Sequence, residues 1–175
     1  MKIFDLFCGA GGFSKGFEQV VGGNFETVLG VDILPMSVET LRLNHPGALG
    51  VCGDIRQLRC ADIGSRLKIK KGELGLIIGG PPCQGFLSIR PFRSSHDDDP
   101  RNSLFEQFAN FVNYFRPRAL VMENVVPREG ARLQSFDDDY KFAGNRSQIV
   151  KQIGNAVPPL RGKAIGQALA TALVS

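Results

Sequence analysis

The chain has few residues that could hold a metal ion. Its 175 residues include four cysteines, with no C-x-x-C pair, and two histidines, whereas structural zinc sites need closely spaced cysteine and histidine ligands. His96 is followed by Asp97, Asp98 and Asp99, but a charged run of this kind is usually a solvated loop. We therefore expect no metal site.

Long apolar runs are absent as well. No stretch could span a bilayer, and the start of the chain lacks the layout of a signal peptide, so we expect a cytoplasmic protein with no membrane partner. The composition, 43% hydrophobic and 22% charged, is typical of a globular protein, and the length suits one domain. The net charge of +4 is compatible with a polyanionic partner but does not identify one.

Apolar runs alternate along the chain with patterns of helical period. We expect strands at residues 2–7, 25–32, 48–54, 73–80 and 118–125. Apolar residues at steps of three and four predict helices between and after them: Phe13, Phe17 and Val20; Leu34, Val38 and Leu41; Leu104, Phe108, Phe111 and Phe115; and, after Pro158 and Pro159, Leu160, Ala164, Ala168 and Ala172. Almost wholly apolar strands that alternate with helices predict the α/β class, with a doubly wound, mostly parallel sheet. Ligands of such sheets bind at the carboxyl ends of the strands.

A glycine-rich turn follows the first strand. Gly9, Gly11 and Gly12 would let backbone N–H groups approach a ligand closely. A complete G-x-G-x-x-G motif is lacking, because Ser14 stands at the position of the third glycine. The turn therefore disfavours a dinucleotide.

Acidic residues end the next two strands. Asp32 could accept hydrogen bonds from both hydroxyls of a ribose, and Asp54 could accept one from the amino group of an adenine. Together they predict a nucleoside site. The alternative is a tight turn beside two solvated acids.

Two further residues at strand ends could carry chemistry. Cys83 follows Pro81 and Pro82 in a loop flanked by glycines, which favours a placed nucleophile over a small buried apolar residue. Glu123 follows four apolar residues, where an unpaired carboxylate costs energy unless it serves a partner or stays protonated. A general acid is one interpretation of Glu123, and a capping or solvated residue is the other.

Five segments of the chain occur in the order typical of one family. They are FDLFCGAGGFSKGF, GVDI, GGPPCQGF, MENV and KQIGNAVPP, and together they resemble the C5-cytosine DNA methyltransferases over residues 1–126 and 127–175. The resemblance implies the S-adenosyl-L-methionine-dependent methyltransferase variant of the doubly wound sheet. It also implies S-adenosyl-L-methionine as cofactor, double-stranded DNA as partner, a place in restriction-modification and, in a bacterium, association with the nucleoid.

The resemblance further implies roles for particular residues. Those expected to bind the cofactor are Phe4, Asp5, Gly9, Ala10, Gly11, Gly12, Asp32, Ile33, Asp54, Ile55, Pro81, Leu104, Asn155 and Val157. Those expected to contact DNA are Gln84, Ser88, Arg90, Arg93 and Arg101.

By the same resemblance, Cys83 is the nucleophile and Glu123 its partner in catalysis. The Cys83 thiolate would add to C6 of a flipped-out cytosine, and Glu123 would engage N3 and the exocyclic amine. The stretch from residue 87 to 102 matches the mobile loop of the family. Leu87 departs from the pattern, because a small hydroxyl residue is usual there.

A large part of the family pattern is missing after Val126, which runs straight into Pro127. No Q-x-R-x-R motif occurs, and the region that reads bases in the family is absent, although base contacts are what supply sequence specificity. Residues 1–126 would form the catalytic and cofactor-binding core, and residues 127–175 would return to it. The gap has three explanations: an internal segment absent from this sequence, which we favour; a deletion; or a recognition subunit supplied in trans.

Other functions are compatible with this pattern. The chain could be a catalytically inactive cofactor-binding or regulatory subunit, or a deletion fragment, although Cys83 and Glu123 are retained. It could also be a tRNA-directed cytosine methyltransferase of the same fold. A small-molecule methyltransferase is weaker, because it would need neither the PPCQ nor the ENV segment.

Overall fold

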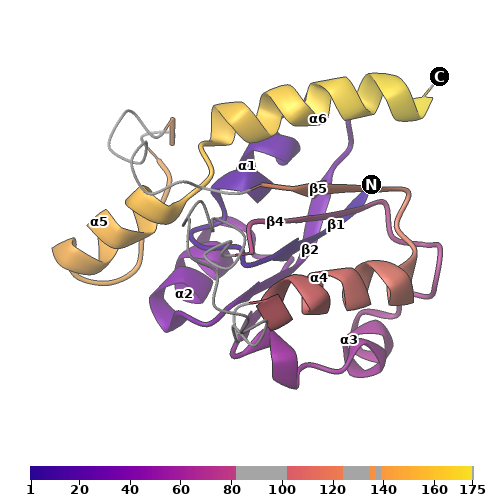
Figure 1. Cartoon of the computed structure of the whole chain (residues 1–175). Helices are drawn as coiled ribbons and strands as arrows, with labels where there is room; N and C mark the ends of the chain where they lie inside the picture. Colours follow the sequence, from indigo (N-terminus) through magenta and orange to yellow (C-terminus); the bar gives the residue numbers. More distant parts are fainter. Residues whose placement is uncertain (82–101, 124–134, 137–138, 175) are drawn as a thin grey trace, which may run out of the picture.

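A computed structural model describes residues 1–81, 102–123, 135–136 and 139–174 (Figure 1). Five parallel strands form one sheet in the order β3-β2-β1-β4-β5. They are β1 (Lys2–Leu6), β2 (Glu26–Asp32), β3 (Leu49–Cys52), β4 (Leu76–Gly79) and β5 (Ala119–Met122). The chain order reverses between β1 and β4, so the carboxyl ends of these two strands flank the crevice where such sheets bind ligands. The predicted doubly wound α/β fold is confirmed.

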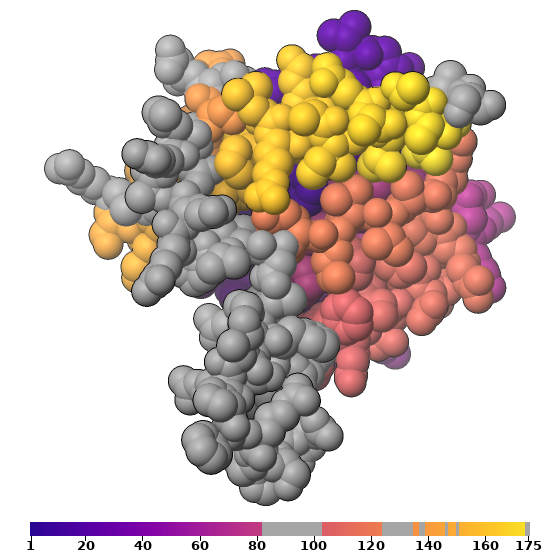
Figure 2. Space-filling view, turned by 45° about the horizontal axis from the view of Figure 1, so that its top comes forward, coloured from indigo at the N-terminus to yellow at the C-terminus, as the bar shows by residue number. Residues whose placement is uncertain are grey.

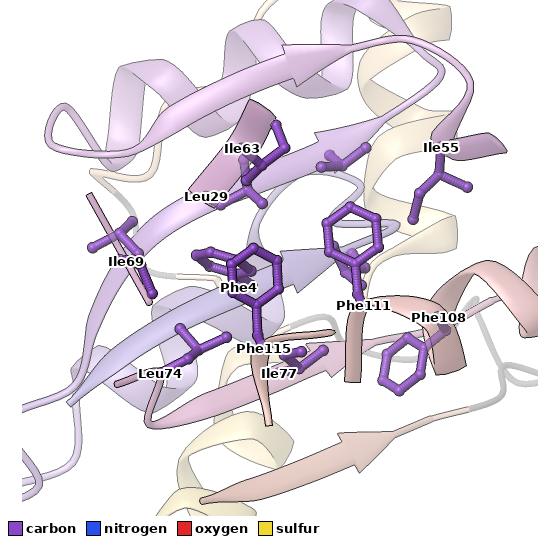
Figure 3. Packing of buried hydrophobic residues seen from close by; sticks show 13 residues of the cluster. Phe4, Leu29, Ile55, Ile63, Ile69, Leu74, Ile77, Phe108, Phe111 and Phe115 are labelled. Carbon is purple, nitrogen blue, oxygen red and sulfur yellow. The ribbon is translucent and has the colours of Figure 1, made fainter. Parts of the chain in front are cut away.

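One face of the sheet packs against α3 (Cys60–Leu67) and α4 (Asn102–Phe115), with a short 3-10 turn, η1 (Ile55–Gln57), beside them. Phe108, Phe111 and Phe115 of α4 are buried in the cluster that Figure 3 shows, and the ring of Phe115 meets that of Phe4 edge-on with centroids 4.9 Å apart. The predicted apolar stripe of α4 is therefore confirmed. The helix formed by residues 60–67 was not predicted, since its apolar pattern is short.

The other face is covered by α1 (Gly12–Glu18), α2 (Pro35–Asn44) and α6 (Pro159–Val174). Phe13, Phe17 and Val20 are buried as expected. In α2, Val38 and Leu41 are buried, and the Leu41 side chain lies where a Cβ atom at Gly30 would be.

The helix predicted after Pro158 and Pro159 forms as α6, but the face that predicted it is not its buried face. Leu160, Ala164, Ala168 and Ala172 lie on its exposed side, and α6 instead approaches α1 through glycines. A Cβ atom at residue 16 would lie 2.1 Å from the Pro159 carbonyl oxygen, and one at residue 162 would lie 2.8 Å from the Phe13 carbonyl oxygen. Counting apolar residues misses such a contact, because the closest helix packing selects the smallest residue rather than the most hydrophobic one.

The segment before α6 returns to α2. Asn44 makes two hydrogen bonds to the backbone of Lys141, and the Thr40 hydroxyl donates to the side-chain oxygen of Gln152 in α5 (Arg146–Asn155). Asn145 and Gln148 form a reciprocal capping box at the start of α5. This helix was not predicted, although Asn followed three residues later by Gln is its sequence signature.

Two further features concern the length of the helices and the edge of the sheet. No helix among the described residues is both long and apolar enough to cross a membrane. The half-exposed strand β5 lies at the edge of the sheet as the structure describes it, with Leu120 and Met122 on the surface.

We expect Gly16→Ala to lower the free energy of unfolding by about 2 kcal/mol or more, because the added methyl group overlaps the backbone of α6. The loss should occur although alanine is the better helix former. Urea denaturation followed by circular dichroism measures it. Gly47→Ala is the control, since a Cβ atom at residue 47 meets nothing within 4 Å; equal stability of the two variants would show that the helices do not need this contact.

Candidate active site

A cavity of about 460 Å³ lies at the carboxyl edge of the sheet. Its walls come from the segments that follow β1, β2, β3 and β4, from the start of α4 and from the end of α5. The lining residues are Phe7, Gly9, Val31, Asp32, Ile33, Leu34, Ser37, Gly53, Asp54, Ile55, Arg56, Gly80, Pro81, Leu104, Gln152, Gly154 and Asn155. This volume and this position are those of a small-molecule site in a doubly wound sheet.

The glycine-rich turn lies between the cavity and the C-terminal segment. Gly9 lines the cavity and has a φ of 51°, so it occupies the left-handed region that favours glycine. Gly11 has a φ of 80°, and a Cβ atom there would lie 2.9 Å from the Tyr140 hydroxyl. At residue 12 a Cβ atom would lie 2.3 Å from the Val157 carbonyl oxygen. Gly9 thus leaves space for a ligand, whereas Gly11 and Gly12 allow the turn to pack closely against Tyr140 and Val157.

Asp32 connects this turn to α2. Its Oδ2 accepts a hydrogen bond from the Gly9 N–H and its Oδ1 accepts one from the Leu34 N–H, both at 2.9 Å. Burial raises the pKa of Asp32, although these backbone hydrogen bonds oppose the shift. The carboxylate therefore orders both walls of the cavity and keeps further lone pairs for a ligand.

Asp54 is paired within its own loop. Its Oδ1 caps η1 by accepting from the Arg56 N–H, and the Arg56 Nε lies 2.9 Å from both carboxylate oxygens. These hydrogen bonds from Arg56 lower the pKa of Asp54. Asp54 is thus held as a carboxylate in a cavity that Leu104 and Pro81 also line.

A polar cluster is buried beneath the turn. The Ser14 hydroxyl donates to Asp5 Oδ2 at 2.6 Å, and burial raises the pKa of Asp5 to about 7 against the opposing effect of Ser14. Nearby, His45 Nδ1 lies 2.9 Å from Glu18 Oε2, and the Tyr140 hydroxyl donates to the Ala10 carbonyl oxygen. These bonds connect the turn to α1, α2 and the C-terminal segment.

Glu123 lies at the end of β5 beside the cavity. Its N–H donates to the Gly79 carbonyl oxygen, and Gly80, which lines the cavity, would carry a Cβ atom 3.9 Å from Glu123 Oε2. The other oxygen, Oε1, accepts a 2.7 Å hydrogen bond from Arg161 Nη1. Burial raises the pKa of Glu123, and the charge of Arg161 opposes the shift. A carboxyl group with a raised pKa beside a cavity is a candidate for a functional residue.

The structure places the sequence-predicted cofactor residues in two groups. Those that line the cavity are Gly9, Asp32, Ile33, Asp54, Ile55, Pro81, Leu104 and Asn155. Those that do not line it are Phe4, Asp5, Ala10, Gly11, Gly12 and Val157. Phe4 needs correction: its side chain is fully buried in the core because it points to α4, and Phe7 lines the cavity in its place.

Several lining residues were missed by the sequence reasoning. Phe7 has a φ of 65°, which turns the chain away from β1 before the glycines. Gln152 and Gly154 precede Asn155 on α5. If the KQIGN segment is interpreted as the end of a helix, it predicts that they lie near Asn155.

Other predicted residues lie outside the described part of the chain. They are Cys83, Gln84, Ser88, Arg90, Arg93, Arg101 and the run from His96 to Asp99. Two of the described cysteines, Cys8 and Cys60, have thiol pKa values raised by burial, which makes them poor nucleophiles.

Comparison with known proteins decides the family. The profile of the C-5 cytosine-specific DNA methylases matches residues 1–127 and 125–171. The chain belongs to this family. Its members use S-adenosyl-L-methionine as methyl donor, and the neighbouring solved structures share the fold. One, described as a DNA modification methyltransferase encoded within an E. coli prophage, is 32% identical with a TM-score of 0.57, over 71% of this chain and 32% of that one.

Two curated relatives show how much of a family member the chain represents. It is 38% identical to the type II methyltransferase M.AgeI of Thalassovita gelatinovora over 72% of this chain and 28% of the relative. It is 40% identical to the type II methyltransferase M1.HphI of Haemophilus parahaemolyticus over 94% of this chain and 45% of the relative. The chain thus spans less than half the length of these two relatives.

We expect the stability of the chain to fall between about pH 4 and pH 7, in part because of Asp5. Its pKa is 3.8 ordinarily and about 7 in the fold. Between these two values the folded state binds one proton more than the unfolded state does. The free energy of unfolding therefore falls as the pH rises, by up to about 1.4 kcal/mol per pH unit. Asp5→Asn keeps an acceptor for Ser14 and removes the titration, so its unfolding free energy should depend less on pH. Urea denaturation at several pH values tests this; Asp62→Asn, at an exposed position of α3, should retain the wild-type slope.

Proposed function

We propose that the chain is the catalytic core of a DNA (cytosine-5-)-methyltransferase, which transfers the methyl group of S-adenosyl-L-methionine to C5 of a flipped-out cytosine. One observation carries the proposal. In a chain that belongs to the C-5 cytosine methylase family, the buried carboxylate of Glu123 lies beside Gly80 at the wall of a cavity built around Asp32 and Asp54.

The cavity fits the cofactor in its chemistry. Asp32 would accept hydrogen bonds from the ribose hydroxyls, as acidic residues at this strand end do in nucleotide sites. Asp54 would accept a hydrogen bond from the adenine amino group, and Ile33, Ile55, Leu104 and Phe7 give apolar surface around the purine. When bound, S-adenosyl-L-methionine supplies the methyl group.

The catalytic work belongs to Cys83 and Glu123. The Cys83 thiolate would add to C6 of the cytosine, which moves electron density to C5 and makes that carbon a nucleophile. Glu123 would hold N3 and the exocyclic amine and stabilise the charge that develops on the ring. After C5 has gained its methyl group, a base accepts the C5 proton, the electron pair of the C5–H bond forms the C5–C6 double bond, and Cys83 leaves C6 as a thiolate.

Binding to double-stranded DNA is proposed for the segment after β4. Arg90, Arg93 and Arg101 would contact phosphates, and Gln84 and Ser88 would lie close to the flipped base. Leu87 makes this segment depart from the family pattern.

The region that selects the target sequence would lie between residues 126 and 127 of the chain. The family profile matches in two parts that meet at residues 125–127, which supports a member whose central part is absent from this sequence. The recognition region would then belong to a longer protein or come from a second polypeptide.

Denaturing intact-mass spectrometry tests the mechanism. The protein is incubated with S-adenosyl-L-methionine and random-sequence duplexes that contain 5-fluorocytosine, in which fluorine replaces the C5 proton and blocks the final elimination. We expect a covalent protein–DNA adduct that Cys83→Ser abolishes. Cys52→Ser, at an exposed cysteine, is the matched control and should retain it.

Three outcomes would contradict the proposal. An adduct that survives in Cys83→Ser would exclude the covalent mechanism. Cofactor binding without any adduct would favour the inactive, cofactor-binding subunit, and methyl transfer to tRNA rather than to duplex DNA would favour the tRNA-directed enzyme.

We also expect Asp32→Asn to weaken the binding of S-adenosyl-L-methionine by about 10- to 100-fold. Both oxygens of Asp32 accept from backbone N–H groups, so an amide must turn an NH₂ group toward one of these donors, at a cost of roughly 1.5–3 kcal/mol. Isothermal titration calorimetry measures the affinity. Glu26→Gln, at the opposite end of β2, should bind as the wild type does; equal weakening in both variants would remove Asp32 from the site.

A further inference from the structure

We propose that Arg161 is a positioning residue for Glu123: its guanidinium holds Oε1 and so directs Oε2 to the ligand at the cavity wall. This inference rests on the proposed function, because it takes Glu123 as the carboxylate that meets the cytosine. It adds a residue from the C-terminal helix α6, which none of the motifs singled out.

The two partners differ in how accessible they are. The Glu123 side chain is 6% exposed and that of Arg161 is 58% exposed, with Nη1 and Oε1 2.7 Å apart. The carboxylate is therefore buried, and the guanidinium contacts it from the surface of the protein. This arrangement engages Oε1 with a charge-assisted hydrogen bond and leaves Oε2 without a contact to Arg161.

The second carboxylate oxygen of Glu123 lacks a partner that a ligand could supply. Glu123 Oε2 is buried and has no hydrogen-bond partner among the described residues, and a buried carboxylate oxygen without a partner costs free energy. Gly80 is the residue next to it, with a Cβ position 3.9 Å away, and Gly80 lines the cavity. The unpaired oxygen thus lies at the wall where the base would enter.

The position of Arg161 in α6 is unfavourable unless it has such a role. Its N–H donates to the Pro158 carbonyl oxygen, so it lies in the first turn of α6, where the helix dipole disfavours a positive side chain. The ion pair with Glu123 offsets this cost. Gly16 and Gly162 hold the same turn of α6 against α1, so the guanidinium is presented from a fixed backbone.

Arg161 also sets the charge around Glu123. Within the described part of the chain it is the charged group that acts on this carboxylate, where it opposes the effect of burial on the pKa. Removing Arg161 should therefore raise the pKa of Glu123 and shift the pH profile of any step that depends on its protonation.

The first test compares the rate of 5-fluorocytosine adduct formation across pH for the wild type, Arg161→Gln, Arg161→Lys and Arg118→Gln. We expect Arg161→Gln to slow adduct formation at least tenfold and to move the carboxylate limb of the profile to higher pH, with cofactor affinity within twofold of the wild type. Arg161→Lys should recover part of the rate. Arg118, which donates to the Leu173 carbonyl oxygen, is the control and should leave rate and profile unchanged.

A second readout separates this inference from the proposed function. In protein labelled with ¹³C at the glutamate carboxyl, the Glu123 signal is assigned by its loss in Glu123→Gln, and its titration is followed by NMR without DNA. We expect a higher midpoint in Arg161→Gln than in the wild type, whether or not the wild type forms an adduct. An unchanged midpoint, or an adduct rate and pH profile equal to those of the wild type, would overturn the role of Arg161.

Discussion

The close packing of α1 on α6 is the contact on which the site depends. At Gly16 and Gly162 the two helices approach so closely that even a Cβ atom would overlap a backbone atom of the partner. This contact brings a segment that is distant in sequence onto the N-terminal sheet, where α6 lies along the surface above β5 and α4 (Figure 2). Asn155 before α6 thereby reaches the cavity that the strand ends form, and Arg161 within α6 reaches Glu123 at the end of β5.

A second constraint is the number of carboxylates that meet near the glycine turn. Asp5 and Glu18 lie behind it, and Asp32 lines the cavity in front of it. Each has partners: Asp5 has the Ser14 hydroxyl, Glu18 has His45 and the Thr27 N–H, and Asp32 has two backbone N–H groups. Because buried charge is costly unless it is hydrogen-bonded, these bonds fix the path of the turn before any ligand arrives.

The catalytic arrangement we propose divides its parts between the two halves of the chain. The N-terminal part supplies Asp32, Asp54, Cys83 and Glu123, and the part after residue 126 supplies Asn155 and Arg161. The junction between these parts comes three residues after Glu123 in the sequence, and β5 is an exposed edge in the described sheet. In the arrangement we propose, a recognition region attached at the junction would follow the Glu123 carboxylate closely along the chain, and this carboxylate is the group that a base flipped from DNA would meet.

The sequence by itself determined the fold class and the family, and it named eight of the 17 residues that line the cavity. Continuous apolar strands and the stripe of Phe108, Phe111 and Phe115 require burial on both faces of a sheet, and local motifs at strand ends are brought together by topology alone. It did not determine the buried face of α6, because the glycines that make this contact add nothing to a pattern of apolar residues. Nor did it determine that Phe7, and not Phe4, lines the cavity. The pairing of Arg161 with Glu123 was decided only by the tertiary structure, because two residues 38 positions apart meet through the packing of whole helices and strands, and no local pattern records that distance.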